Sequence, residues 1–168
     1  MSNAPYGNTV ISKVGKALNS LLWNNIKDDP AFKGIITSER QISLLSPKEV
    51  ADSKTSIKLC VFLYGITEYT VIKNTPQTVG KSQSTPLYLT LHYLFVPYTQ
   101  NAEIDHVLLD KIIQLFKDNP VLPSSTSGNQ ELRLTMDALS TDDLNKIWTM
   151  LATPYKTSLG YSVFPVAI

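Results

Sequence analysis

Few residues of this chain have the types and spacing that catalysis or metal binding needs. Its two histidines are His92, within an apolar stretch, and His106, next to Asp105. Neither belongs to a Cys-x-x-Cys, His-x-x-x-His or His-Glu-x-x-His pattern. Because a zinc site takes three or four Cys, His or carboxylate ligands, the sequence predicts no metal site and no cofactor. Both histidines are interpreted as structural or partly exposed residues.

The only cysteine, Cys60, lies in the apolar run 59–63 and cannot form an internal disulfide. Paired with a histidine, it could act as a nucleophile. Burial among leucine, valine and phenylalanine side chains disfavours the thiolate that such chemistry requires. We therefore expect a buried, inert thiol that packs as a small apolar side chain.

Two further patterns resemble functional motifs. Gly80-Lys81-Ser82 is similar to the end of a phosphate-binding loop, but Thr75 stands where that motif has its first glycine. The acidic pairs Asp28-Asp29 and Asp142-Asp143 fall at the ends of predicted helices, the second at an N-terminus that favours negative charge. The chain is therefore interpreted as a non-enzyme. The alternative is a small enzyme with an unrecognised carboxylate or Cys60 site.

The composition is that of a globular protein, with 43% apolar and 17% charged residues among 168. A net charge of +1 argues against a nucleic-acid partner, because phosphate contacts need clustered lysine and arginine. No run approaches the ~20 apolar residues of a membrane span, so we expect no direct membrane insertion. The N-terminus lacks the features of a signal peptide, which predicts a cytoplasmic protein.

Apolar spacing and capping residues predict the helices. Three amphipathic helices are expected over residues 8–28, 103–117 and 140–151. A shorter helix should begin at the capping box formed by Ser46 and Glu49. These helices must pack their apolar stripes on a sheet to form a core.

Strands are predicted at residues 56–72, 87–96, 131–137 and 161–168, with a short one around Ile42. Pro165 confines the last strand to a sheet edge or to a bulge. Residues 74–85 form a polar loop without apolar periodicity. The prediction is an α+β (mixed α/β) fold with about four strands and three helices, in a single domain over residues 1–168.

A series of motifs then resembles one known domain. In chain order it runs Leu89-Thr90-Leu91-His92-Tyr93-Leu94-Phe95-Val96-Pro97-Tyr98, Asp105-His106-Val107-Leu108-Leu109, Asp118-Asn119-Pro120-Val121-Leu122, Asp143-Leu144-Asn145-Lys146-Ile147-Trp148, Thr153-Pro154-Tyr155 and Phe164-Pro165-Val166-Ala167-Ile168. The series resembles the N-terminal domain of the cap proteins of extracellular contractile injection systems, of the virulence-cassette and antifeeding-prophage type.

The resemblance implies a tail terminator. Such proteins form a hexameric ring on the end of the inner tube, stop its growth and hold the last sheath layer. The implied partners are further copies of the chain, the inner-tube protein and the sheath protein, without catalysis or a cofactor. The chain would assemble in the cytoplasm as part of an injection particle. The alternative within this class is an adaptor or baseplate-type component of the same particle.

Candidate interface residues follow from the predicted strands and loops. A terminal edge strand offers unpaired backbone groups for strand addition by a partner. A long polar loop on a rigid scaffold commonly carries contacts. The predicted interface residues are Tyr155, Tyr161, Phe164, Val166, Ile168, Val79 and Lys81.

Overall fold

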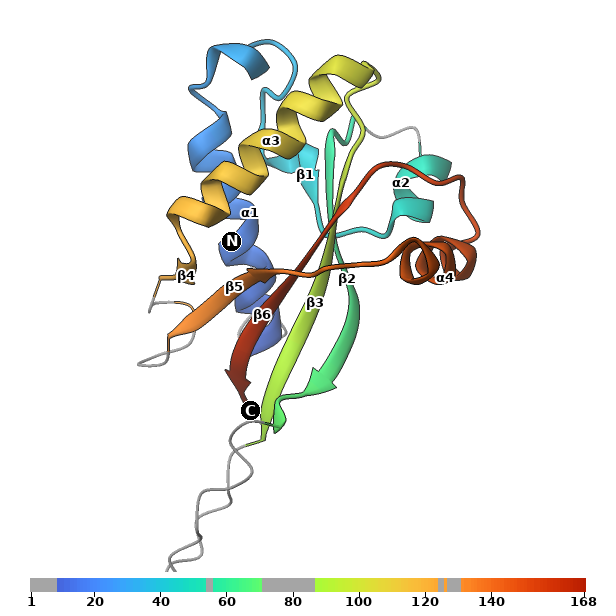
Figure 1. Cartoon of the computed structure of the whole chain (residues 1–168). Helices are drawn as coiled ribbons and strands as arrows, with labels where there is room; N and C mark the ends of the chain where they lie inside the picture. Colours follow the sequence, from blue (N-terminus) through green and yellow to red (C-terminus); the bar gives the residue numbers. More distant parts are fainter. Residues whose placement is uncertain (1–8, 54–55, 71–86, 124–125, 127–130) are drawn as a thin grey trace, which may run out of the picture.

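A mixed sheet of six strands forms the centre of the chain in the computed structural model, which describes residues 9–53, 56–70, 87–123, 126 and 131–168. The strands lie in the order β1-β2-β3-β6-β5-β4 (Figure 1). Only β1 and β2 are parallel. Their bounds are β1 Ile42–Ser43, β2 Leu59–Glu68, β3 Tyr88–Pro97, β4 Val121–Leu122, β5 Leu132–Met136 and β6 Leu159–Ala167.

The predicted α+β fold is confirmed, but the expected number of strands was too low. β1 is the short strand that the sequence predicts around Ile42, and β4 is the strand that it does not predict; each has only two residues. A strand as short as β4 does not show the alternation of apolar and polar residues on which strand prediction depends. Each of these two short strands lies at an outer edge of the sheet.

Helices cover both faces of this sheet. α1 (Val10–Ile26) and α3 (Ala102–Asp118) pack on one face, where their buried residues join the larger hydrophobic core. α2 (Pro47–Asp52) and α4 (Thr141–Leu151) contribute to a smaller core on the other face (Figure 1). The three predicted amphipathic helices and the short capped helix are therefore confirmed. In the described part of the chain, no helix has the length and apolar character of a membrane span.

The alternation along β3 decides which side chains enter which core. Leu91, Tyr93 and Phe95 point into the larger core, whereas Leu94 and Val96 point into the smaller one. Phe95 also meets the rings of Phe116 and Tyr161 edge to face, with centroids 5.2 and 5.7 Å away. The central strand therefore stabilises both layers at once.

The position of β6 corrects the prediction of a terminal edge strand. β6 lies inside the sheet and pairs with β3 on one side and with β5 on the other. Pro165 falls where the register with β3 shifts, between the pairs Leu89–Val166 and Leu91–Val163. A bulge interrupts the ladder there and tolerates a residue without an N–H group. The bulge prediction is confirmed and the edge prediction is wrong.

Candidate functional site

A group of polar side chains lies on the sheet face that α4 covers in part. β2 contributes Tyr64 and Thr67, β3 contributes His92, and β6 contributes Ser162. Asp137 follows directly after β5. These five residues, called the His92 cluster below, combine histidine, serine and aspartate. They are therefore the first place to look for catalysis.

Glycines on two strands let the side chains meet. Gly65 pairs with His92 immediately after a bulge on β2. A Cβ atom on Gly160 would lie 2.6 Å from Cδ1 of Leu139 and 3.3 Å from Cβ of Asp137. Because real Cβ atoms need more space than this, the glycine allows the segment after β5 to lie against β6. This close approach places Asp137 beside Ser162.

The hydrogen bonds of the His92 cluster differ from those of a nucleophilic triad, in which histidine Nε2 takes the serine proton. Ser162 Oγ donates to Oδ1 of Asp137 at 2.6 Å and lies 2.8 Å from Nδ1 of His92. Since an ionised carboxylate only accepts, Ser162 uses its single proton on Asp137. Nε2 of His92 lies 2.9 Å from Oγ1 of Thr67. The serine is also only 4% exposed, so the cluster joins four segments of the sheet and presents no nucleophile.

Tyr64 closes this network on its outer side. Its hydroxyl lies 3.5 Å from Oδ2 of Asp137, and its ring centroid lies 5.9 Å from that of His92. Burial, together with the negative charge of Asp137, raises the pKa of Tyr64 to about 12. The phenol therefore stays protonated at neutral pH and does not act as a base.

Ser162→Ala is expected to lower the free energy of unfolding by about 1 kcal/mol, because it leaves partly buried groups of Asp137 and His92 without their shared partner. Urea denaturation followed by circular dichroism measures the change. Thr135→Ala is the matched control, since Thr135 lies opposite Ser162 on β5 and is exposed. A structural role for the cluster is contradicted if both variants have the same stability.

Cys60 is the second candidate nucleophile, and its surroundings confirm the expectation of a buried thiol. It is fully buried in the smaller core, and Sγ lies 2.9 Å from the carbonyl oxygen of Leu45, to which it donates. Burial, with a contribution from the charge of Glu49, raises the pKa of the thiol to about 12. The thiolate is thus a negligible fraction at neutral pH.

Cys60 is therefore expected to resist alkylation by iodoacetamide at pH 8 in the folded protein. With a pKa of about 12, only about one thiol in ten thousand is ionised at this pH. Mass spectrometry after timed exposure measures the rate of alkylation, and the urea-unfolded chain is the control. Equal rates in both states would show that the thiol is accessible and reactive.

The remaining polar candidates have structural roles or stand alone. Asp29 caps a short turn and pairs with Lys111 at 2.7 Å; a hydrogen bond from this lysine lowers the pKa of the carboxyl. Asp143 completes the capping box of Ser140 at the start of α4. His106 is exposed on α3. Among the described residues, no three His, Cys, Asp or Glu side chains are placed to bind a metal ion.

The structure separates the predicted interface residues into three groups. Tyr161 and Val166 are 4% and 0% exposed and belong to the larger core. Phe164 is half-buried, whereas Tyr155 and Ile168 are 58% and 61% exposed. Val79 and Lys81 lie outside the described residues. The exposure of Tyr155 and Ile168 is compatible with an interface role, which stays a prediction for these two residues. The burial of Tyr161 and Val166 gives no support for an interface role there.

The exposed position of Tyr155 is stabilised by the residue that follows it. Lys156 pairs with the buried carboxylate of Asp105 at 3.1 Å and lies 5.1 Å from the ring centroid of Tyr98. Asp105 also accepts hydrogen bonds from the backbone amide and the hydroxyl of Thr99, at 2.9 and 2.6 Å. The segment after α4 is therefore attached to α3 and to the residues that follow β3.

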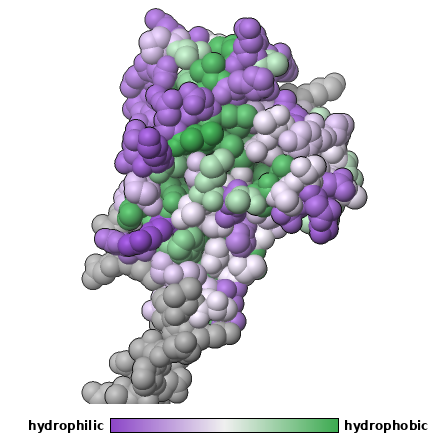
Figure 2. Space-filling model, viewed as in Figure 1, coloured by the Kyte–Doolittle hydropathy of each residue, from purple (hydrophilic) through white to green (hydrophobic). Residues whose placement is uncertain are grey.

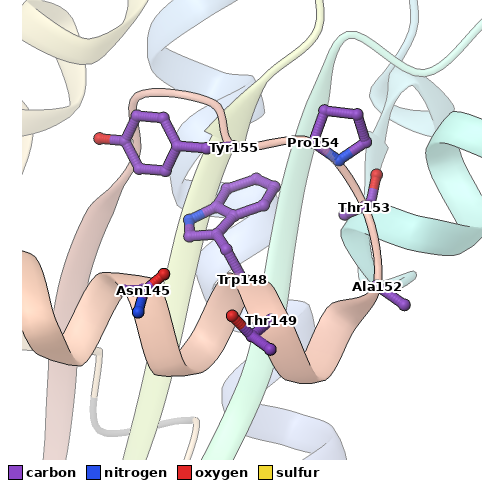
Figure 3. A pocket seen from close by; sticks show the side chains of 7 residues that line it. All are labelled: Asn145, Trp148, Thr149, Ala152, Thr153, Pro154 and Tyr155. Atoms are coloured by element: carbon purple, nitrogen blue, oxygen red, sulfur yellow. The ribbon is translucent and has the colours of Figure 1, made fainter.

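Tyr155 lines a pocket of about 440 Å³ at the end of α4. Its ring meets the indole of Trp148 edge to face, with the centroids 5.5 Å apart. Figure 3 shows the indole nitrogen facing the space between Tyr155 and Asn145. The sequence pattern predicts Trp148 as a core residue, which is correct, but it contains no signal for this pocket.

Comparisons with known proteins assign the fold to a family. Residues 13–168 match the family model of the Pvc16 N-terminal domain. The chain belongs to this family. The family assignment confirms the resemblance seen in the motifs around β3, α4 and β6. No curated protein matched the chain in a separate comparison.

Two solved structures show the same fold as this Pvc16 N-terminal domain. One is the sheath/tube terminator of PVC, an extracellular contractile injection system, in its extended state, with a TM-score of 0.62 and 18% identity. The other is the tube-terminating cap of the anti-feeding prophage, with a TM-score of 0.60 and 16% identity. Each match covers 96% of this chain. The chain spans only 57% and 56% of the length of these two proteins.

Proposed function

We propose that this chain is a structural subunit of a phage-tail-like contractile injection system. In this proposal it forms a ring, six-fold as the cap resemblance implies, that terminates the inner tube and anchors the last sheath layer. The observation that carries the proposal is the match, over 96% of the chain, to a sheath/tube terminator and to a tube-terminating cap. The absence of an accessible nucleophile in the His92 cluster and at Cys60 favours this role over the enzymatic alternative.

An open strand edge supports the formation of a ring. β1 pairs only with Leu59 and Cys60, so the rest of the ten-residue strand β2 extends beyond it. Within the described residues, no other strand lies along this outer edge of β2 (Figure 1). Backbone groups at such an edge accept a further strand from a neighbouring chain. We propose this edge, instead of the predicted β6, as the place of subunit contact.

Exposed apolar side chains support an assembled state as well. Figure 2 shows hydrophobic surface gathered in the middle of one face, next to hydrophilic surface. Contiguous apolar surface of this kind marks interaction sites. The large apolar residues that are at least 39% exposed are Leu44, Leu45, Ile66, Leu87, Val107, Val121, Met136, Met150, Tyr155 and Ile168.

Electron microscopy of the purified chain tests the proposal directly. Negative-stain images should show closed rings with six-fold class averages, and light scattering should give the mass of the same oligomer. When purified tubes and sheaths are added, the rings should sit at one end of them. A chain that stays monomeric at high concentration and never associates with tube or sheath contradicts the proposal. A label found along the particle or at its baseplate would instead indicate the adaptor role.

Ile66→Asp is expected to prevent most ring formation while leaving the melting temperature nearly unchanged. Ile66 lies on β2 beyond β1 and is 48% exposed, so a carboxylate there is tolerated in the monomer but disfavoured in a contact. Sedimentation velocity measures the oligomer fraction. Met150→Asp, at a 75% exposed position on α4, is the control and should still form rings. The proposed contact is wrong if Ile66→Asp assembles like the unmodified chain.

A further inference from the structure

We infer that the pocket beside Trp148 is a docking site for an extended, proline-containing peptide segment of another protein chain. Seven residues line this pocket, all from α4 and the segment after it: Asn145, Trp148, Thr149, Ala152, Thr153, Pro154 and Tyr155. The inference depends on the local chemistry of these residues and not on the proposed capping role. It would therefore hold for an adaptor or any other subunit.

The first reason is a hydrogen-bond donor without an acceptor. Trp148 is 96% buried, being 4% exposed, and its indole Nε1–H has no hydrogen-bond partner. A buried N–H group without a partner is unfavourable, and tryptophan usually finds an acceptor when it is buried. Figure 3 shows the nitrogen directed into the pocket, between the side chains of Asn145 and Tyr155. A ligand that brings an acceptor to this point would therefore satisfy the indole N–H group.

The second reason is the exposure of the two flanking side chains. Asn145 is exposed and Tyr155 is 58% exposed, so close packing does not hold either side chain in place. Rotation of the exposed Asn145 side chain opens the indole N–H to an incoming group, while the ring of Tyr155 keeps its contact with the indole. The backbone around Tyr155 stays in position, because Lys156 is held by Asp105. The pocket thus has a fixed backbone, and the side chain of Asn145 can turn aside to admit a ligand.

The third reason is that the residues lining the pocket are uncharged, which favours an uncharged hydrogen-bond acceptor. None of the seven lining residues is ionisable near neutral pH, so a carboxylate or phosphate would enter without a counter-charge. A backbone carbonyl satisfies the indole N–H without adding charge. The amide of Asn145 and the hydroxyls of Thr149 and Thr153 offer both donors and acceptors for the flanking peptide groups.

The arrangement of the two aromatic rings favours a proline side chain in the ligand. The rings of Trp148 and Tyr155 meet at an angle of 66° and form two sides of a notch. Aromatic-lined grooves bind polyproline II segments, whose conformation is already formed before binding. A proline packed against these rings adds no N–H group that would need its own acceptor. The volume of about 440 Å³ falls within the range of known ligand pockets.

Proton–nitrogen correlation spectra of the full chain test the inference. The chain has two tryptophans, Trp23 and Trp148, and thus two indole signals. A capped oligoproline peptide, titrated to about 1 mM, should shift the Trp148 indole signal downfield in a saturable manner. A capped glycine–serine peptide of equal length should not shift it. Trp148→Phe should weaken peptide binding by about tenfold, because it keeps one aromatic ring but removes the N–H donor and part of the indole surface.

Two further variants keep the test specific. Tyr155→Ala removes one wall of the notch and should also weaken binding, whereas Trp23→Phe, on α1 and outside the lining, should leave it unchanged. Thermal melts establish that each variant is folded. The inference is overturned if oligoproline does not move the Trp148 signal, or if Trp148→Phe binds it as tightly as the unmodified chain. A shift that depends only on protein concentration would also overturn it and would indicate a second copy in the pocket.

Discussion

Tyr161→Ala is expected to lower the free energy of unfolding by about 3–5 kcal/mol, the range for truncation of large core aromatics. The ring of Tyr161 lies in the centre of the larger core, 4.9 Å from the ring centroid of Phe116 and 5.7 Å from that of Phe95. Its removal opens a cavity between α3 and two central strands. Denaturant unfolding monitored by far-ultraviolet circular dichroism measures the loss.

Tyr161→Phe is the matched control, because it keeps the ring and removes only the hydroxyl. We expect its stability to stay within about 1 kcal/mol of the original. The two variants also distinguish a core role from the interface role that the sequence predicts for Tyr161. If Tyr161→Ala folds with undiminished stability and fails only in ring assembly, the residue acts at an interface and the core assignment is wrong.

Asp105→Ala is expected to lower the free energy of unfolding by about 2–3 kcal/mol at pH 7. The carboxylate is only 9% exposed and accepts hydrogen bonds from the amide and hydroxyl of Thr99 and from Lys156. Alanine leaves all three donors without this acceptor. Asp110→Ala, on an exposed position of the same helix, is the control and should change stability by about 0.5 kcal/mol at most.

The contribution of Asp105 should disappear in acid. Burial alone would raise its pKa, but the hydrogen bonds from Thr99 and Lys156 outweigh burial and lower the pKa below 3.8. A depressed pKa means that the stabilisation is complete above the unfolded value and is lost as the pH falls through the folded value. The difference in stability between Asp105→Ala and the original chain should therefore shrink below about pH 4. A difference that stays constant down to pH 2 would contradict this assignment.

Much of the fold follows from local signals. Ser46 begins a helix with the capping box that the sequence predicts, and Ser140 caps the helix predicted over 140–151. The alternation of residues along β3 correctly predicts which of its side chains lie on each face of the sheet. These features depend on residues within one or two turns or along one strand, so the sequence contains the information needed to predict them.

Strand order could not be predicted in the same way. The proline in β6 is compatible with an edge or with a bulge, and only the pairing partners decide between them. Those partners, β3 and β5, are distant in the chain from one another. The His92 cluster could not be predicted for the same reason, because Ser162 and His92 are 70 positions apart in the sequence. The free indole N–H of Trp148 depends on side-chain positions that no periodicity encodes.

The insertion of β6 between β3 and β5 determines when the sheet can be completed during synthesis. β3 and β5 both precede β6 in the chain, yet neither pairs with the other. A nascent chain that has not yet produced β6 therefore keeps two open strand edges and an uncovered apolar core. Such long-range pairing folds slowly and leaves aggregation-prone surface exposed for longer. This domain should depend on chaperones while it is being translated, and far less once β6 is in place.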